Sequence, residues 1–188
     1  MKVLKTELDG VLIIEPDFFP DSRGFFFESY NKKKYEEAGM NFDFVQDNIS
    51  KSNKGTVRGL HYQVGEYAQG KLCQVLTGSV MDVAVDIRSG SPTYGKHVAV
   101  ELTGDNHKQI WIPPGFAHGF SVLEDNSLFS YKCTAFYSKK DERAILYCDA
   151  DLNIDWNVLQ PIVSEKDLEA KKSQKLIKIF LHAIKSLK

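Results

Sequence analysis

The stretch SVMDVAVDI, residues 79–87, decides the fold class because its side chains alternate with a period of two. One face carries Ser79, Met81, Val83, Val85 and Ile87, and the other carries Val80, Asp82, Ala84 and Asp86. Successive side chains of a β-strand point to opposite faces. The alternation therefore predicts a strand with one buried side and one more polar side.

Turn signals surround this strand and separate it from further strand-like runs. TGS (77–79), RSGSPTYG (88–95) and LTGDN (102–106) lie between it and the runs HVAVEL and KQIWI. Period-two patterning dominates from about residue 70 to 148, without a long helical pattern between successive runs. A parallel sheet with helical crossovers is therefore disfavoured, and we expect a mainly β protein with a jelly-roll barrel or sandwich.

Helical patterns occur in two segments. In NKKKYEEAG (31–39), Asn31 can cap a short helix and Gly39 can end it. After Pro161, Ser164 and Asp167 have the spacing of a capping box, which predicts a C-terminal helix at about residues 164–188. Its apolar stripe would consist of Leu176, Ile177, Phe180, Leu181, Ile184 and Leu187. We expect one domain of 188 residues with this helix as an appendage.

The composition argues against several classes of function. The 24 Lys and Arg residues balance the 25 Asp and Glu residues, so there is no chain-wide basic field for nucleic acid. The first apolar run, residues 11–14, is too short for a secretion signal or a membrane span. The three cysteines show no close pairing, which argues against a disulfide framework and predicts a cytoplasmic protein.

The segment RGLHYQ (58–63) contains the first candidate for chemistry. In an alternating strand His61 shares a face with Gly59 and Gln63, and polar groups on that face suit a cavity better than an apolar core. Lys71 follows on the next run, and His118 lies in WIPPGFAHGF (111–120). A packed structural histidine, a metal ligand and a proton carrier are all open interpretations of His61.

The same segments resemble the two signature segments of cupin barrels. Metal-binding cupins place two histidines in H-x-H spacing in the first segment and another histidine in the second. Here Gln63 stands where the second histidine would be, and Lys71 brings a cation. Because transition-metal sites generally need three or four ligands, we expect no metal. A metal-dependent cupin enzyme that uses His61 and His118 is the alternative from another class.

Several further side chains suit an anionic substrate and proton transfer. Tyr131 and Tyr137 are an even number of residues apart, so both could enter one cavity if no bulge intervenes. Cations nearby would lower the pKa of a buried phenol from its usual value of about 10. Arg23 in DSRGFFFESYN (21–31) could join Arg58 in binding a diphosphate. Asp167 either completes the capping box alone or also accepts the imidazole N–H of a histidine.

The order of the motifs indicates a family. The chain contains DSRGFFFESYN, FVQDNIS, RGLHYQ, QGKL, DVAVDIRSGSPTYG, WIPPGFAHGF, YKCT, IDW and SEKD in that order. Over roughly residues 8–168 it closely resembles the dTDP-4-dehydrorhamnose 3,5-epimerase family. The resemblance implies a cupin-like jelly roll without a metal or other cofactor. It also implies a homodimer in which an N-terminal strand of one subunit joins the sheet of the other.

The resemblance further implies the reaction and its residues. The family's substrate is dTDP-4-dehydro-6-deoxy-D-glucose, which is inverted at C3 and C5 through an enolate to give dTDP-4-dehydro-L-rhamnose for polysaccharide biosynthesis. By this resemblance His61 is the base, Asp167 orients it, Lys71 stabilises the enolate and Tyr131 is the acid. The implied substrate-binding residues are Arg23, Glu28, Gln46, Asn48, Arg58, His118, Tyr137, Glu142 and Lys166.

The sequence departs from the family pattern at two places, and two further functions are alternatives to the implied one. The chain has IDWN where the family usually has IDWP, and its lysine-rich tail follows no family pattern. Neither departure involves the implied base, acid or lysine. An epimerase that inverts C3 alone keeps most of these motifs, and a sugar-nucleotide binding module without catalysis would also keep the binding residues.

Overall fold

The computed structural model describes residues 1–173, whose regular structure is mainly β-strand, as expected. The strands are β1 (Lys2–Lys5), β2 (Leu12–Glu15), β3 (Phe18–Asp21), β4 (Gly24–Phe27), β5 (Gln46–Ser52), β6 (Val57–Gln63), β7 (Lys71–Thr77), β8 (Ser79–Asp86), β9 (His97–Thr103), β10 (Gln109–Ile112), β11 (Phe116–Val122), β12 (Ser127–Cys133) and β13 (Glu142–Ala144). The helical elements are α1 (Lys32–Glu37), the short 3-10 turn η1 (Gly65–Tyr67) and α2 (Glu165–Leu168).

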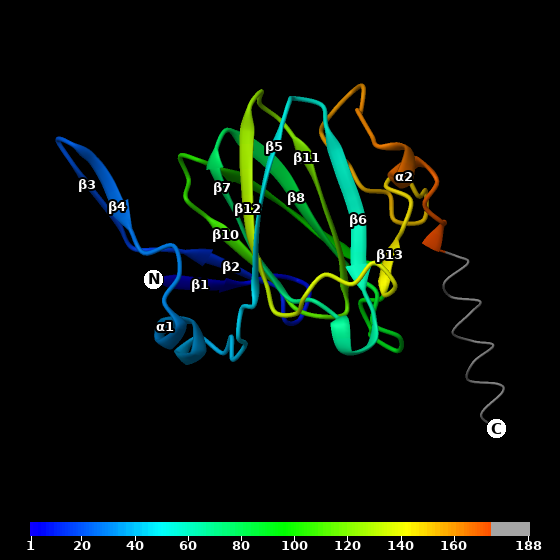
Figure 1. Ribbon diagram of the computed structural model, residues 1–188, viewed down its shortest axis with the longest axis horizontal. Helices are drawn as coiled ribbons and strands as arrows, with labels where there is room; N and C mark the ends of the chain where they lie inside the picture. The colour runs from blue at the N-terminus through cyan, green and yellow to red at the C-terminus, as the bar shows by residue number, and fades with distance from the viewer. Residues whose placement is uncertain (174–188) are drawn as a thin grey trace.

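Two antiparallel sheets face each other and form the body of the molecule (Figure 1). One has the strand order β1-β2-β10-β7-β12-β5 and the other has the order β13-β6-β11-β8-β9. Consecutive strands such as β10, β11 and β12 alternate between the two sheets, as in a jelly roll. The main core cluster lies between the sheets and takes side chains from β7, β8, β10, β11 and β12.

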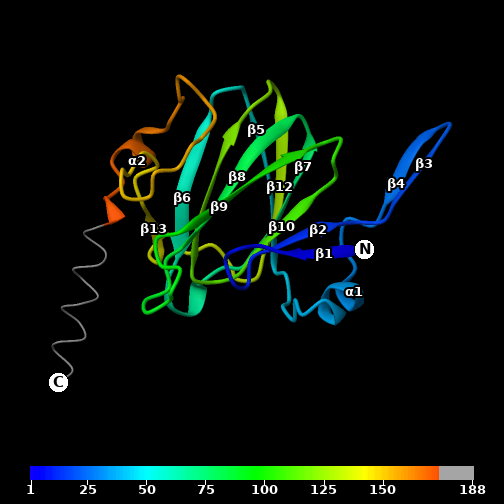
Figure 2. The same ribbon diagram turned by 180° about the vertical axis from the view of Figure 1, so that it is seen from behind.

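Strand β8 differs from the expectation in one respect, because both of its faces are buried. Val80 and Ala84, from the more polar face, pack in the core between the sheets. Val83 and Val85, from the apolar face, pack instead in a second cluster with residues of the 145–163 segment. In Figures 1 and 2 this segment runs beside the five-stranded sheet. The more polar face of β8 therefore points into the barrel, where Asp82 is completely buried.

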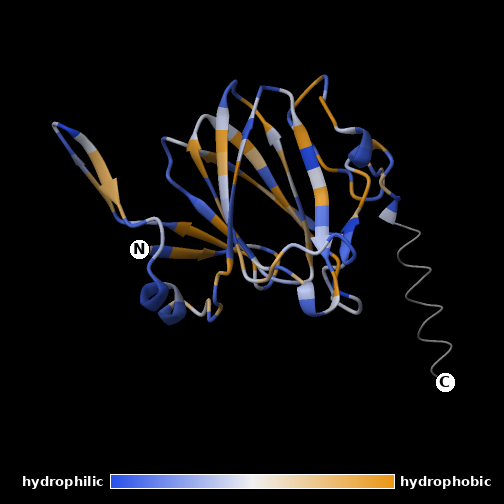
Figure 3. Ribbon diagram, viewed as in Figure 1, coloured by the Kyte–Doolittle hydropathy of each residue, from blue (hydrophilic) through white to orange (hydrophobic). Residues whose placement is uncertain are grey.

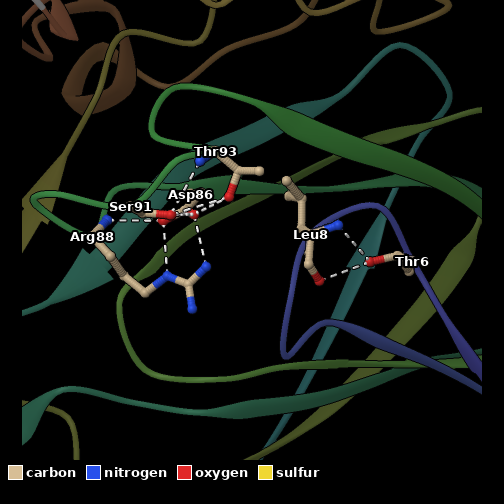
Figure 4. Close-up of polar contacts among 6 residues, drawn as sticks. All are labelled: Thr6, Leu8, Asp86, Arg88, Ser91 and Thr93. Carbon is tan, nitrogen blue, oxygen red and sulfur yellow. Dashed lines mark hydrogen bonds and ion pairs between the residues drawn. The ribbon is translucent and has the colours of Figure 1, made fainter.

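A buried carboxylate fixes the turn that follows β8 (Figure 4). Asp86 accepts hydrogen bonds from Arg88 Nη2 at 2.7 Å and from the hydroxyls of Ser91 and Thr93 at 2.6 Å each. Burial opposes ionisation of this carboxyl, but these hydrogen bonds outweigh it and lower its pKa. The Arg88 guanidinium lies 4.5 Å from the ring centre of Phe116, the first residue of β11. The network thus ties this turn to the strand that carries His118.

The first predicted helix is confirmed and the second is only partly correct. Asn31 caps α1 by accepting a hydrogen bond from the backbone N–H of Lys34. Ser164 caps α2 in the same way, but α2 ends at Leu168. Beyond it, Lys171 forms a β-bridge with Ile145, so backbone pairing replaces the expected continuous helix. The rest of the predicted helix, residues 174–188, lies outside the described residues. No helix within residues 1–173 is long and apolar enough to cross a membrane.

Strands β3 and β4 form a separate hairpin that projects from the body beside the N-terminus (Figure 1). Figure 3 shows hydrophobic residues along this hairpin. On one face, Phe18 stacks on His107 with 4.3 Å between ring centres, which anchors the hairpin to the loop before β10. On the other face, Phe19 and Phe26 are 58% and 66% exposed. An apolar hairpin of this kind is a candidate for contact with another chain.

Candidate active site

An extra residue in β6 brings two predicted side chains into one cavity. His118 on β11 pairs with His61, whereas Phe120 pairs with Arg58, so three steps along β6 match two steps along β11. Such a bulge reverses the facing of the residues beyond it. Simple alternation would place Arg58 and His61 on opposite faces, but both line the same cavity. Gly59 permits this arrangement, because a Cβ there would lie 2.5 Å from the Cα of Gly119.

The cavity has a volume of about 620 Å³ and opens between the two sheets. It brings together seven of the predicted site residues, which are Arg58, His61, Lys71, His118, Tyr131, Lys166 and Asp167. These residues come from β6, β7, β11, β12 and α2. A cavity of this size suits a small-molecule ligand rather than a macromolecule.

His61 and Asp167 form a close pair in the wall of the cavity. The distance from His61 Nε2 to Asp167 Oδ1 is 2.6 Å, and the side chain of Asp167 is only 4% exposed. Burial opposes ionisation of Asp167, but its hydrogen bond and charge interaction with His61 outweigh this effect and lower its pKa. The backbone N–H of Asp167 donates to Ser164 Oγ at 3.2 Å. The residue thus completes the helix cap with its backbone and binds the histidine with its side chain.

Lys71 and Tyr131 lie together on neighbouring strands. Lys71 Nζ is 5.8 Å from the centre of the Tyr131 ring. Burial raises the pKa of Tyr131 to about 12, with further increases from the nearby Cys133 and Cys73. The expectation of a lowered pKa was therefore wrong, because desolvation of the phenolate outweighs the charge of nearby cations such as Arg58. The phenol keeps its proton at neutral pH.

His118 makes a second histidine–carboxylate pair, deeper in the barrel. Its Nε2 lies 3.0 Å from Asp82 Oδ2, and both side chains are buried. Burial lowers the pKa of His118 more than the charge of Asp82 raises it, which favours a neutral ring. Sequence reasoning did not single out Asp82 as a site residue. Its place on the more polar face of residues 79–87 was the available signal.

Within residues 1–173, one group of side chains has the donor types for a metal ion. The ligand atoms of Cys73, Asp82 and His118 all lie within 4.8 Å of one another. Burial raises the pKa of the Cys73 thiol well above its usual value, which opposes the thiolate that a metal requires. Gln63, at the position of a cupin metal ligand, instead donates to the backbone carbonyls of Tyr67 and Phe136 at 2.7 and 3.0 Å. The donor set therefore fits a metal poorly.

Four more predicted residues form hydrogen-bonded pairs beside the cavity. Gln46 Nε2 donates to Asn48 Oδ1 at 3.0 Å. The hydroxyl of Tyr137 donates to Glu142 at 3.0 Å, and Lys166 Nζ lies 2.7 Å from the same carboxylate. Tyr137 is 53% exposed and lies beyond the end of β12, so it does not share the cavity wall with Tyr131 in this chain. The end of the strand at Cys133 breaks the alternation on which that expectation rested.

Arg23 and Glu28 lie apart from the other predicted residues. Arg23 occupies the tip of the β3–β4 hairpin, where its side chain is 87% exposed and pairs with Asp21 at 2.6 Å. Glu28 follows β4 and contacts Lys34 and Asn31. Neither residue lines the cavity of its own chain. The β3–β4 hairpin, which carries Arg23 and immediately precedes Glu28, projects away from the barrel (Figure 1).

Comparisons with known proteins identify relatives of this chain. A curated protein of Shigella flexneri, dTDP-4-dehydrorhamnose 3,5-epimerase, is 57% identical over 173 residues, covering 92% of this chain and 96% of the relative. The crystal structure of the Elizabethkingia anophelis enzyme of the same name has a TM-score of 0.89 and 50% identity, covering 93% of this chain and 97% of that one.

A second solved structure contains a ligand. It is a dTDP-6-deoxy-D-glucose-3,5-epimerase of Legionella pneumophila in complex with dTDP-4-keto-L-rhamnose, with a TM-score of 0.88 and 52% identity, covering 91% of this chain and 92% of that one. The jelly roll is thus of the cupin-like type found in these enzymes. The model of the dTDP-4-dehydrorhamnose 3,5-epimerase family matches residues 5–175, and the chain belongs to this family.

Proposed function

We propose that the chain inverts C3 and C5 of dTDP-4-dehydro-6-deoxy-D-glucose and releases dTDP-4-dehydro-L-rhamnose. The observation that carries the proposal is the 2.6 Å pair of His61 and Asp167 in a cavity that also contains Lys71 and Tyr131. The C4 ketone of this sugar acidifies the hydrogens on both adjacent carbons. Inversion at each carbon then requires a base on one face and an acid on the other.

His61 is the proposed base. An ionised Asp167 accepts the Nε2–H of His61, which leaves Nδ1 unprotonated and able to take a proton from carbon. The lowered pKa of Asp167 supports this assignment, because the carboxylate stays charged and stabilises the imidazolium that forms. Proton abstraction by a positioned side chain typically contributes a factor of about 10² to 10⁴ to the rate.

Lys71 and Tyr131 complete the proposed chemistry. As the proton leaves carbon, negative charge develops on the C4 oxygen, and the Lys71 ammonium stabilises that charge. Tyr131 then returns a proton from the opposite face of the ring. Before the second inversion the imidazolium loses its proton to solvent and the phenolate regains one from solvent. Its pKa of about 12 supports this role, because the phenol carries its proton at the start of each turnover.

The binding residues are assigned by their place around the cavity. Arg58 supplies the cation for the diphosphate, and its Nε already donates to Ser52 Oγ at 3.1 Å. His118 and Lys166 line the same cavity. We assign Gln46, Asn48, Tyr137 and Glu142 to contacts with the nucleotide or sugar at its edge.

Arg23 and Glu28 serve the cavity of a second copy in this proposal. The exposed Phe19 and Phe26 on the hairpin support a homodimer, because they would be covered by the partner chain. A complementation experiment tests it. Arg23→Ala and His61→Ala are each expected to be inactive. Mixing them under exchange conditions should restore activity, since each mixed dimer contains one intact site and one site that lacks both residues. No recovery in mixtures whose mixed dimers are verified by mass would contradict the shared site.

Deuterium exchange tests the reaction itself. Enzyme and dTDP-4-dehydro-6-deoxy-D-glucose are incubated in deuterated water, and NMR locates the label. Label at C3 and C5 with formation of the L-rhamno product supports the proposal. Label and inversion at C3 alone would support the C3-only epimerase, and tight binding without exchange would support a binding module. His61→Ala should abolish exchange at both carbons, and full exchange in this variant would reject His61 as the base.

The metal-dependent alternative is tested by chelation. We expect exchange to continue after treatment with a strong chelator and dialysis, with neither metal nor organic cofactor added. Loss of exchange on chelation and its return with one metal ion would support the alternative. We also place the enzyme in the cytoplasm, supported by the free thiols of Cys73, Cys133 and Cys148.

A further inference from the structure

Ser50 contains a buried hydroxyl that the proposed mechanism does not use. Within residues 1–173, its Oγ is the one side-chain nitrogen or oxygen atom that is buried without a hydrogen-bond partner. Leaving such a group unpaired is unfavourable, so native proteins contain few of them. Ser50 also belongs to the wall of the active-site cavity.

The position of Ser50 indicates which part of a ligand it would meet. On β5 it lies two residues from Asn48 and two from Ser52, so all three share one face of the strand. Ser52 accepts the hydrogen bond from Arg58 Nε, and Arg58 is the cation assigned to the diphosphate. On the neighbouring strand, Ser50 pairs with Phe129, two residues from Tyr131. Ser50 is therefore placed between the proposed phosphate-binding and sugar-binding side chains.

We propose that Ser50 is a substrate-contacting residue whose hydroxyl donates a hydrogen bond to a diphosphate oxygen of the bound sugar nucleotide. This inference rests on the proposed function. A serine hydroxyl can rotate between staggered positions about χ1, so it can turn toward an acceptor that enters the cavity. The unpaired hydroxyl is then satisfied only in the complex. The free enzyme tolerates an unfavourable group that becomes favourable on binding.

This role makes two predictions that a structural serine would not share. Ser50→Ala removes a hydrogen bond from the complex but none from the free protein. The affinity for dTDP, measured by calorimetry, should fall by roughly 10- to 100-fold, because the lost bond is to a charged oxygen. The melting temperature of the free protein should stay equal or rise. Affinity for thymidine, which lacks the diphosphate, should not change.

Ser127 offers a matched control away from the cavity. It is also a buried serine at a strand, but its hydroxyl accepts from the backbone N–H of Ser79 at 3.2 Å and donates to the carbonyl of Glu124 at 2.7 Å. Ser127→Ala should therefore lower the melting temperature and leave dTDP affinity unchanged. Ser50→Ala and Ser127→Ala are expected to show opposite signatures.

Two results would overturn the inference. One is that Ser50→Ala binds dTDP with the same affinity as the wild-type protein. The other is a loss of affinity that accompanies a lowered melting temperature or extends equally to thymidine. Both readouts are independent of turnover. If the unchanged protein binds dTDP but exchanges no deuterium, the proposed function fails while the binding role of Ser50 is still decided by calorimetry.

Discussion

Asp167→Asn removes one negative charge from the His61 pair and leaves the size of the side chain unchanged. The distance from His61 Nε2 to Asp167 Oδ1 is short, at 2.6 Å, and the Asp167 side chain is 4% exposed. Solvent therefore cannot compensate for the loss of the negative charge. A hydrogen bond to a charged group is worth about 1.5 to 3 kcal/mol. Because each 1.4 kcal/mol is a factor of ten, proton exchange should slow by roughly 10- to 150-fold. Substrate affinity should change less, since the carboxylate acts through the histidine.

Deuterium exchange followed by NMR measures this effect at C3 and C5 separately. Both rates should fall by similar factors, because one base serves both carbons. Ser164→Ala is the matched control, since it removes the helix cap that Asp167 shares and keeps the carboxylate. It should cost about 1 kcal/mol of unfolding free energy with little change in exchange. Exchange at the original rate in folded Asp167→Asn would refute the pairing, as would equal slowing in Ser164→Ala.

Four other outcomes follow from the same geometry. Lys71→Ala should lower kcat by about 10² to 10³, the cost of losing one donor to a developing oxyanion; a change in KM alone would indicate a binding role. Tyr131→Phe should still lose substrate hydrogen to solvent but fail to complete inversion, and full inversion would point to another acid. Folding raises the pKa of Tyr131 from about 10 to about 12, so the folded state disfavours the phenolate. The free energy of unfolding should therefore be unaffected by this group below pH 10 and should fall by about 2 to 3 kcal/mol as the pH rises to 12. Denaturant unfolding should show this loss, and Tyr131→Phe should lack it. Gly59→Ala should destabilise by more than about 2 kcal/mol, because φ is +123° and the added Cβ meets the backbone of β11; an unchanged melting temperature would contradict this.

The local elements were predictable because their signals are short in range. Alternation over residues 79–87 correctly predicted β8, and Asn31 and Gly39 correctly bounded α1. The predicted C-terminal helix is interrupted after Leu168, because the competing interaction is not local. Lys171 pairs with Ile145, 26 positions earlier, and no sequence pattern near residue 171 reports that bridge.

The candidate site was likewise predictable in part from local sequence patterns. Motif order identified His61, Lys71, Tyr131 and Asp167 as residues of one family site, and the cavity contains all four. The pattern of residues 164–167 predicted a helix cap, and this cap is present. That the same aspartate also reaches a histidine 106 residues away depends on how the chain returns to the barrel.

By itself, the sequence determined the β character of the chain, its family and the identity of the chemical groups. The tertiary structure decided which way those groups face. The extra residue at Gly59 orients the side chain of Arg58 toward the same cavity as His61. The 145–163 segment packs on the apolar face of β8, so the more polar face of β8 points inward. Burial then raised the pKa of Tyr131, although cations lie nearby. Facing and desolvation depend on contacts between distant segments, whereas alternation and capping depend only on neighbours along the chain.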